Sequence, residues 1–207
     1  EALPHLLGGM LKRKSQGRFV EAAELHEFLQ QAIETGAEIP SEELPNYHLE
    51  WADTQLTLGD REGAESTLNS GEFKDGSREL AKAGMLRFKM YSTAGAFDEG
   101  LKCLEGISDV IESLNDKGLE IRYRTNLAIV LMFKRDFKSA LAESDRELEL
   151  ARNSGRDFEL ARCLNNRFNI YFRLATGSSS ATDHLQFAGD CIIEAANIFK
   201  KLGRVDW

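Results

Sequence analysis

The sequence Gly17-Arg18-Phe19-Val20-Glu21-Ala22 recurs in altered form along the chain. Its later versions are Gly59-Asp60-Arg61-Glu62-Gly63-Ala64, Gly95-Ala96-Phe97-Asp98-Glu99-Gly100 and Arg135-Asp136-Phe137-Lys138-Ser139-Ala140, so their starts lie 42, 36 and 40 residues apart. Each version stands between two stretches whose apolar residues follow the spacing of an amphipathic helix. A period of this size with one helix pair per period is typical of a solenoid, because one pair cannot bury its own apolar face and neighbouring pairs must stack.

The recurring positions resemble the tetratricopeptide-repeat family. In that family a small residue makes the tight turn, an aromatic two residues later fills the helix junction, and an alanine three residues further on lets the helices approach closely. Gly17, Phe19 and Ala22 match all three positions, whereas Arg61 replaces the aromatic and Arg135 the glycine in later units. Because the period exceeds the roughly 34 residues of the plain repeat, the chain resembles the long-helix subclass found in kinesin light chains, polarity scaffolds and sensor domains of bacterial activators.

The resemblance implies an all-α fold, a right-handed superhelical solenoid of about five antiparallel helix pairs. We expect a single domain over 1–207, with pairs at approximately 2–36, 41–70, 78–116, 119–154 and 156–203. We expect helices at 2–15, 78–93 and 157–175 and one continuous helix over 97–115. We also expect a Gly/Ser-rich insertion at 176–182 and a cap on the last helix from Asp183. The chain begins with Glu1 rather than methionine, and its last residues, 202–207, resemble the start of another repeat. We therefore expect a fragment of a longer protein.

Composition and motifs exclude several classes of function. The formal net charge of -8 argues against direct binding to nucleic acid or to anionic membranes. No run of 18 apolar residues occurs, so no membrane insertion is expected. The three cysteines are odd in number and form no CxxC motif, which predicts free thiols and a reducing, cytoplasmic location. Each lies in a helical pattern, which predicts a buried side chain. Because phosphate loops, GxGxxG and HExxH motifs are absent, we expect no catalytic residues, no metal and no cofactor.

The resemblance also indicates where a ligand binds. In this family the first helix of each pair lines the concave face, and one stripe at helical spacing touches the ligand. Ile129 and Met132 belong to such a stripe, and Asp53 belongs to an acidic one. The predicted peptide-binding residues are the basic and asparagine side chains of the three later stripes: Lys82, Lys89, Arg122, Asn126, Arg162, Asn165, Asn166, Asn169 and Arg173.

These residue types suit an extended acidic peptide. Asparagine amides donate to and accept from a peptide backbone, and arginine binds a carboxylate with two hydrogen bonds. The acidic stripe would give the groove a charge gradient that fixes the direction of the ligand. The alternative is an ordinary solvated helix face, in which Arg162 and Arg122 pair with Glu159 and Glu120.

The sequence therefore predicts a non-enzymatic protein–protein interaction module, a scaffold or adaptor that binds an acidic peptide segment in a concave groove. One alternative is a domain of a larger transcriptional or signalling regulator that senses a small molecule or a peptide. Another is an architectural subunit of a large assembly, whose convex faces carry the contacts. The partner is expected to be a protein or a peptide, and the sequence leaves the oligomeric state open.

Overall fold

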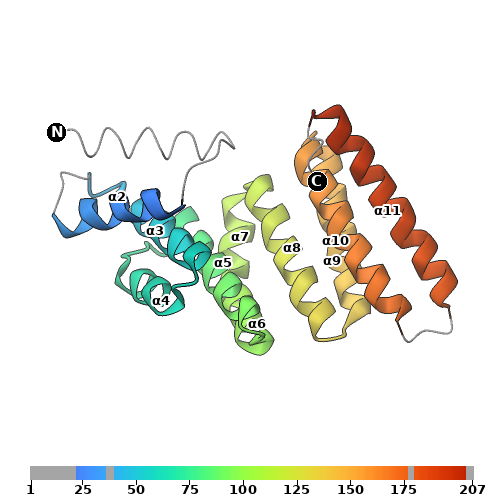
Figure 1. Cartoon of the computed structure of the whole chain (residues 1–207), viewed down its shortest axis with the longest axis horizontal. Helices are drawn as coiled ribbons and strands as arrows, with labels where there is room; N and C mark the ends of the chain where they lie inside the picture. The colour runs from blue at the N-terminus through green and yellow to red at the C-terminus, as the bar shows by residue number, and fades with distance from the viewer. Residues whose placement is uncertain (1–21, 36–39, 177–179, 204–207) are drawn as a thin grey trace. The chain divides into compact units, whose positions relative to one another are not determined.

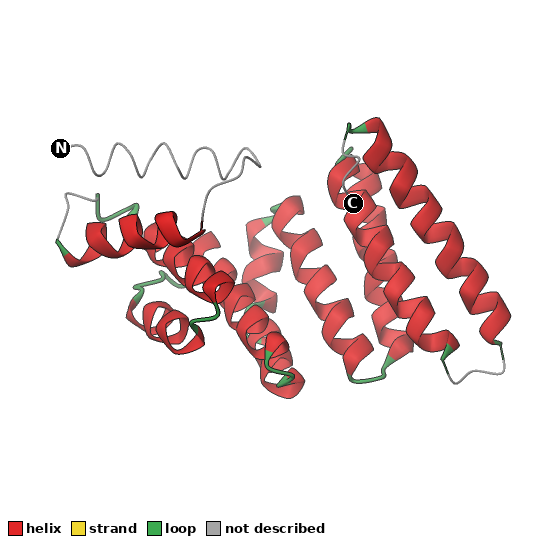
Figure 2. Cartoon of the chain, in the orientation of Figure 1, coloured by secondary structure: helices red, strands yellow, loops and turns green. Residues whose placement is uncertain are grey.

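A computed structural model describes residues 22–35, 40–176 and 180–203 of the chain. This described part is all-helical and contains no strand, as Figure 2 shows. It divides into two compact units, Glu1–Ala94 and Gly95–Trp207. The predicted helix at 2–15 and the first version of the recurring sequence, up to Glu21, lie outside the described residues. So do residues 177–179 of the predicted insertion.

The first unit is built around one central helix. Its helices are α2 (Ala22–Glu34), α3 (Leu44–Leu58), α4 (Arg61–Ser70) and α5 (Arg78–Thr93), and α3 packs against the other three (Figure 1). Small side chains let the helices approach closely, because alanines of α3, α4 and α5 meet in one core cluster. That cluster consists of Leu49, Ala52, Ala64, Leu68 and Ala83. Trp51 links α3 to α2 by donating from Nε1 to His26 Nδ1 at 3.1 Å.

The second unit contains two long antiparallel pairs. After α6 (Phe97–Glu105) and α7 (Ser108–Leu114) come α8 (Lys117–Phe133) with α9 (Phe137–Asn153), and α10 (Asp157–Ala175) with α11 (Ala181–Lys201). Helix α10 also packs against α8 and α9 of the preceding pair (Figure 1). The main core lies where α9, α10 and α11 meet, and it includes Leu148, Leu164, Cys191 and Phe199. Stacking of one pair on the next therefore buries the apolar stripes, as the repeat predicts.

The recurring sequence forms the tight junction between two helices. Gly59, Gly95 and Arg135 share a left-handed backbone, with φ of 86°, 74° and 65°. The amides of Asp60 and Asp136 reach back to the carbonyls of residues 55 and 131, each at 2.9 Å, and so close the preceding helix. The side chains of these two aspartates then accept from the amides of residues 63 and 139, at 2.8 and 3.1 Å. Three residues thus end one helix and start the next.

Arg135 carries a side chain where the other turns use glycine, and this predicts a stabilising substitution. We expect Arg135→Gly to raise the free energy of unfolding by up to about 1 kcal/mol, because relief of left-handed strain outweighs the added entropy of the unfolded glycine. Urea unfolding with circular dichroism measures the change. The opposite kind of substitution, Gly95→Ala, is expected to lower the free energy of unfolding by about 1 kcal/mol. A destabilised Arg135→Gly protein would contradict the argument.

Two local predictions are wrong. The helix expected over 97–115 is broken: α6 ends at Glu105 and α7 begins at Ser108. Glycine at 106 is a poor helix former, and the hydroxyl of Ser108 donates to the Glu105 carbonyl at 3.0 Å, which replaces a helical bond there. Asp183 does not cap the last helix, because α11 already begins at Ala181 and places Asp183 inside its first turn.

Candidate functional site

The second unit contains a groove between the first helices of its two long pairs. Helix α8 and helix α10 lie side by side there and enclose a space of about 280 Å³. We call it the α8/α10 groove, and its lining residues are Ala128, Ile129, Met132, Phe133, Asn166, Asn169, Ile170 and Arg173. The groove therefore brings together Asn166, Asn169 and Arg173 of the predicted set with the two apolar stripe positions of α8.

The groove has an apolar floor and a polar edge. Ala128, Met132 and Ile170 are buried in one cluster, which continues into α9 through Ala140. Asn166 is half-buried and Asn169 is exposed at the α10 edge. The Asn169 amide donates from Nδ2 to the Asn165 carbonyl at 3.1 Å, which leaves its side-chain oxygen to accept from a ligand. An extended chain laid here would meet apolar contacts below and amide groups beside it.

The cationic end of the groove rests on an aromatic stack. The guanidinium carbon of Arg173 lies 4.4 Å from the centroid of the Phe133 ring, and Phe133 stacks on Phe97 at 4.5 Å between ring centroids. A cation over a ring face is held by the ring quadrupole. Arg173 is exposed and makes no ion pair with any described residue. Phe133 was not predicted as a lining residue, although it lies one helical turn after Ile129, which belongs to the predicted stripe.

The remaining predicted residues of this unit lie on the same helices but do not line the groove. Arg122, Arg162 and Asn165 are exposed, and Asn126 is half-buried. The ion pairs considered for Arg122 and Arg162 do not form. Glu120 is held by Arg124 at 2.9 Å and by Lys117 at 3.7 Å, and Glu159 lies 3.5 Å from Arg156.

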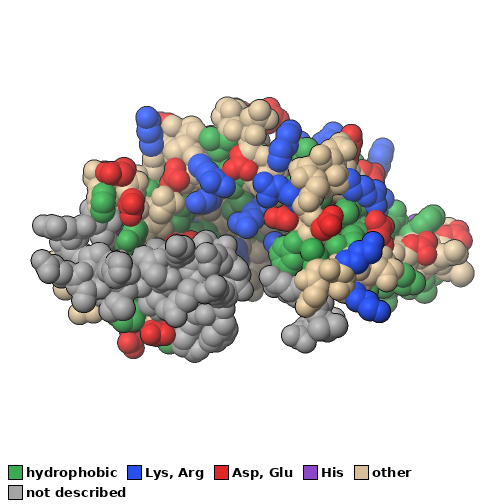
Figure 3. Space-filling view, turned by 90° about the horizontal axis from the view of Figure 1, so that it is seen from above, with side chains coloured by type: hydrophobic (Ala, Val, Ile, Leu, Met, Phe, Trp, Pro, Cys, Tyr) green, Lys and Arg blue, Asp and Glu red, His purple; other side chains and the backbone are tan. Residues whose placement is uncertain are grey.

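The two predicted lysines lie in the first unit, on α5, and contact α3. The ammonium of Lys89 lies 2.7 Å from Asp53 Oδ1, and that of Lys82 donates to Asn46 Oδ1 at 3.4 Å. The acidic stripe therefore meets the neighbouring basic stripe and is partly neutralised by it. On the face drawn in Figure 3, Lys and Arg side chains are interspersed with Asp and Glu.

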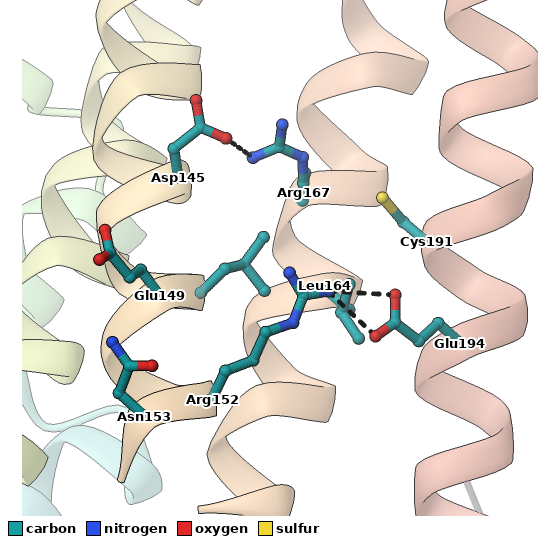
Figure 4. Close-up of a pocket in the computed structure, with 9 residues that line it drawn as sticks. Asp145, Glu149, Arg152, Asn153, Leu164, Arg167, Cys191 and Glu194 are labelled. Carbon is teal, nitrogen blue, oxygen red and sulfur yellow. Dashed lines mark hydrogen bonds and ion pairs between the residues drawn. The ribbon is translucent and has the colours of Figure 1, made fainter.

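A second cavity of about 340 Å³ lies between α9, α10 and α11. Two ion pairs join the helices across it, as Figure 4 shows: Arg167 donates to Asp145 at 2.5 Å, and Arg152 donates to Glu194 at 3.1 Å. Leu164 and Cys191 also line the cavity, and burial raises the pKa of the Cys191 thiol. Ion pairs between neighbouring helices indicate a packing role for these residues.

One carboxylic acid among the described residues of the second unit is fully buried. Glu147 of α9 is 0% exposed; its Oε2 accepts from the Thr125 hydroxyl at 2.6 Å, and its Oε1 accepts from the Ser144 hydroxyl at 3.3 Å. Desolvation raises the pKa of Glu147 to about 7. The same burial raises the pKa of the nearby Cys163 thiol to about 12, so that thiol is inert near neutral pH. Cys163 and Cys191 are buried as predicted, whereas Cys103 of α6 is only half-buried, so the prediction is wrong for that thiol.

Two other kinds of site are absent from the described part of the chain. Its His, Cys, Asp and Glu side chains form no cluster that could hold a metal ion. None of its helices combines the length and apolar character that crossing a membrane requires.

No protein-family model and no curated protein matches this sequence. Solved structures do resemble it. A variant of a kinesin light chain from Podosopora anserina with nearly identical TPR-like repeats has a TM-score of 0.66 at 15% identity, over 98% of this chain and 97% of that one. BtubC from P. vanneervenii has a TM-score of 0.56 at 17% identity, over 98% and 93%.

A third similar structure belongs to a larger protein. It is a signal transduction ATPase with a tetratricopeptide repeat sensor from Pyrococcus horikoshii, with a TM-score of 0.64 at 18% identity. The match covers 86% of this chain but 25% of that one. At these identities the likeness concerns the fold. The chain is thus an all-α solenoid with the fold of tetratricopeptide-like repeats.

Proposed function

We propose that this chain is a protein–protein interaction module that binds an extended acidic peptide segment in the α8/α10 groove. The observation that carries the proposal is the convergence of Asn166, Asn169 and Arg173 on an apolar floor that includes Met132 and Ile170. Amide groups can bond to the ligand backbone, the floor can take an apolar side chain, and the guanidinium of Arg173 can bind a carboxylate. Such groups at the edge of an apolar groove favour an extended peptide over a compact ligand.

Flanking basic residues support the acidic character of the ligand. Arg122 and Arg162 lie on the two helices that form the groove, and both are exposed and free of ion pairs with the described residues. An acidic segment would therefore be attracted along α8 and α10 beyond the groove itself. Exposed charges are screened by salt, so this part of the affinity should weaken as the ionic strength rises.

A display library of random extended peptides tests this proposal. Selection on the immobilised chain is expected to enrich sequences in which aspartate or glutamate flanks an apolar residue. Selection on an Asn166→Ala/Arg173→Glu variant with an unchanged melting temperature is expected to lose them. Enrichment of basic peptides, or recovery of the same peptides on the variant, would refute acidic-peptide binding in this groove.

The second candidate function is that of a sensor domain in a larger regulator. It is favoured by the similarity to the tetratricopeptide repeat sensor, because that structure contains the matching fold as a quarter of a longer chain. The full-length gene discriminates between the two functions. A nucleotide-binding or DNA-binding domain encoded in the same reading frame would favour the sensor, whereas its absence would favour an adaptor.

A further inference from the structure

One side chain that does not line the α8/α10 groove supports its cationic end. Phe97, the first residue of α6, stacks on Phe133 with the two rings 9° from parallel, and Arg173 lies over the same Phe133 ring. Because a stacked ring fills the face that it covers, the guanidinium lies over the opposite face. The three side chains therefore form successive layers, and each layer comes from a different helix: α6, α8 and α10.

The repeat places a charge where the preceding unit has an aromatic ring. The shift of 40 residues that matches Asn126 of α8 to Asn166 of α10 also matches Phe133 to Arg173. A phenylalanine at this position packs on its neighbours, whereas an arginine there can pack on a ring and also bind an anion. The series of stacked side chains thus ends in a cation at the edge of the groove.

The Phe133 ring is the contact that orders the Arg173 side chain. The guanidinium makes no ion pair and no hydrogen bond with any residue that the structure describes. The backbone is fixed, because the hydroxyl of Thr176 donates to the Arg173 carbonyl at 2.7 Å near the end of α10. Ordering a long exposed side chain on binding costs conformational entropy, and the contact with the ring lowers that cost by restricting the guanidinium beforehand.

The ring of Phe133 needs a support of its own. Phe133 is the last residue of α8 and is 38% exposed, so its side chain can turn unless a neighbour packs against it. Phe97 packs against it, with 4.5 Å between the ring centroids. The next residues along the two helices, Asp98 and Lys134, form an ion pair. Helix α6 is therefore joined to α8 at two successive positions, and Phe97 fixes the ring on which the guanidinium rests.

We propose that Phe97 is a positioning residue of the peptide site. It holds the Phe133 ring, and through that ring it holds the Arg173 guanidinium in the arrangement that binds a carboxylate. A guanidinium stacked on a ring keeps its N–H groups in its own plane, where two of them can donate to one carboxylate. Helix α6 is then a third helix of the site, although it does not line the groove. This inference rests on the proposed function, because it assigns a role in the same groove.

NMR spectroscopy of the ligand-free chain tests the positioning by itself. Protons above a ring face are shielded, so the Arg173 Nε–H signal, assigned by its loss in Arg173→Lys, is expected upfield of the ordinary arginine range. Phe97→Leu should move this signal back toward that range, whereas Phe97→Tyr keeps a ring in place and should leave it shifted. Phe158→Leu is the matched control, because Phe158 is also a half-buried phenylalanine in an aromatic pair, with Phe199 at 6.0 Å, but lies outside the groove.

Titration of a fluorescein-labelled acidic peptide from the display selection measures the consequence for binding. We expect Phe97→Leu to weaken the affinity about threefold, while Phe97→Tyr and Phe158→Leu stay close to wild type. In an Arg173→Ala background Phe97→Leu should have no further effect, because the two residues act through one contact. A merely structural role of Phe97 would lower the affinity equally in both backgrounds.

The two measurements separate this inference from the proposed function. An Arg173 signal that is the same in wild type and Phe97→Leu would overturn the inference, and so would equal losses of affinity in the two backgrounds. If Arg173→Ala weakens binding and Phe97→Leu does not, the groove binds the peptide and the role assigned to Phe97 is refuted. If the wild type binds no acidic peptide, the proposed function fails, and the NMR signal still decides whether Phe97 positions Arg173.

Discussion

Replacing Glu147 with glutamine is expected to stabilise the chain at alkaline pH by about 3 kcal/mol. The reason is that the folded state raises the pKa of this fully buried acid from 4.5 to about 7, and one pKa unit corresponds to about 1.4 kcal/mol. Above that pH the wild-type protein must bury a carboxylate between Thr125 of α8 and Ser144 of α9. Glutamine keeps a similar shape and remains neutral.

The sign of the pH dependence follows from the raised pKa. Below about pH 4.5 the acid is protonated in both the folded and the unfolded state, and its contribution to stability is fully present. Between about 4.5 and about 7 the folded state binds the proton that the unfolded state has released, so stability falls as pH rises.

Urea unfolding followed by circular dichroism, at intervals from about pH 4 to about pH 9, measures this effect. The wild type and Glu147→Gln should converge at acidic pH and diverge above neutrality. Glu149→Gln is the control, because Glu149 is an exposed glutamate of the same helix. A constant difference between wild type and Glu147→Gln at every pH would show that Glu147 keeps its ordinary pKa in the folded state.

The second large effect is expected from Arg124→Ala, which should lower the free energy of unfolding by about 2 kcal/mol. Arg124 of α8 donates to Glu120 at 2.9 Å and to Glu143 of α9 at 2.9 Å. Its side chain is 19% exposed and that of Glu143 only 12%. Removing the guanidinium leaves the buried carboxylate of Glu143 and the half-buried carboxylate of Glu120 poorly compensated. Their remaining exposure keeps the cost below that of a fully buried pair.

Thermal unfolding at near-neutral pH measures this loss. Arg146→Ala is the matched control, because Arg146 also contacts Glu143, at 2.6 Å, from a side chain that is 61% exposed. We expect it to cost less than about 0.5 kcal/mol. Adding Glu143→Gln to Arg124→Ala should recover part of the stability. Equal costs for the two arginines would mean that burial does not determine the strength of these pairs.

Local sequence signals predicted most helix bounds. Predicted helices at 78–93 and 157–175 have the same bounds in the structure, and Ser77 caps the first by accepting from the Leu80 amide at 3.0 Å. These bounds depend on capping residues, glycine turns and apolar periodicity, which neighbouring residues determine. The break at Gly106 was missed because one glycine inside an apolar pattern is compatible with a continuous helix.

Features that depend on tertiary contacts were not predictable. Glu147 is seven residues after Ala140, just as Ala195 is seven after Ala188, so the repeat pattern suggests a small buried residue there. Only the packing of α8 and α9 shows how the acid is hydrogen-bonded. The groove was predicted in part. Helical spacing assigned Asn166 and Ile129 to ligand-facing stripes of their own helices, but only the structure shows that the two residues line the same groove.

The central claim is that the α8/α10 groove binds an extended acidic peptide, and fluorescence anisotropy tests it most directly. The probe is one fluorescein-labelled acidic peptide chosen by the display selection, titrated with four proteins of equal melting temperature. These are the wild type, Arg173→Glu, the combination Arg162→Glu/Asn166→Ala/Asn169→Ala/Arg173→Glu, and Lys200→Glu, which reverses one exposed charge on α11 outside the groove.

We expect Arg173→Glu to weaken binding at least about tenfold, which corresponds to about 1.4 kcal/mol. The combined variant should abolish binding, and Lys200→Glu should leave it close to wild type. Added salt should weaken the wild-type complex. Equal affinity of the wild type and the combined variant would contradict the account and place peptide binding on another surface of the chain.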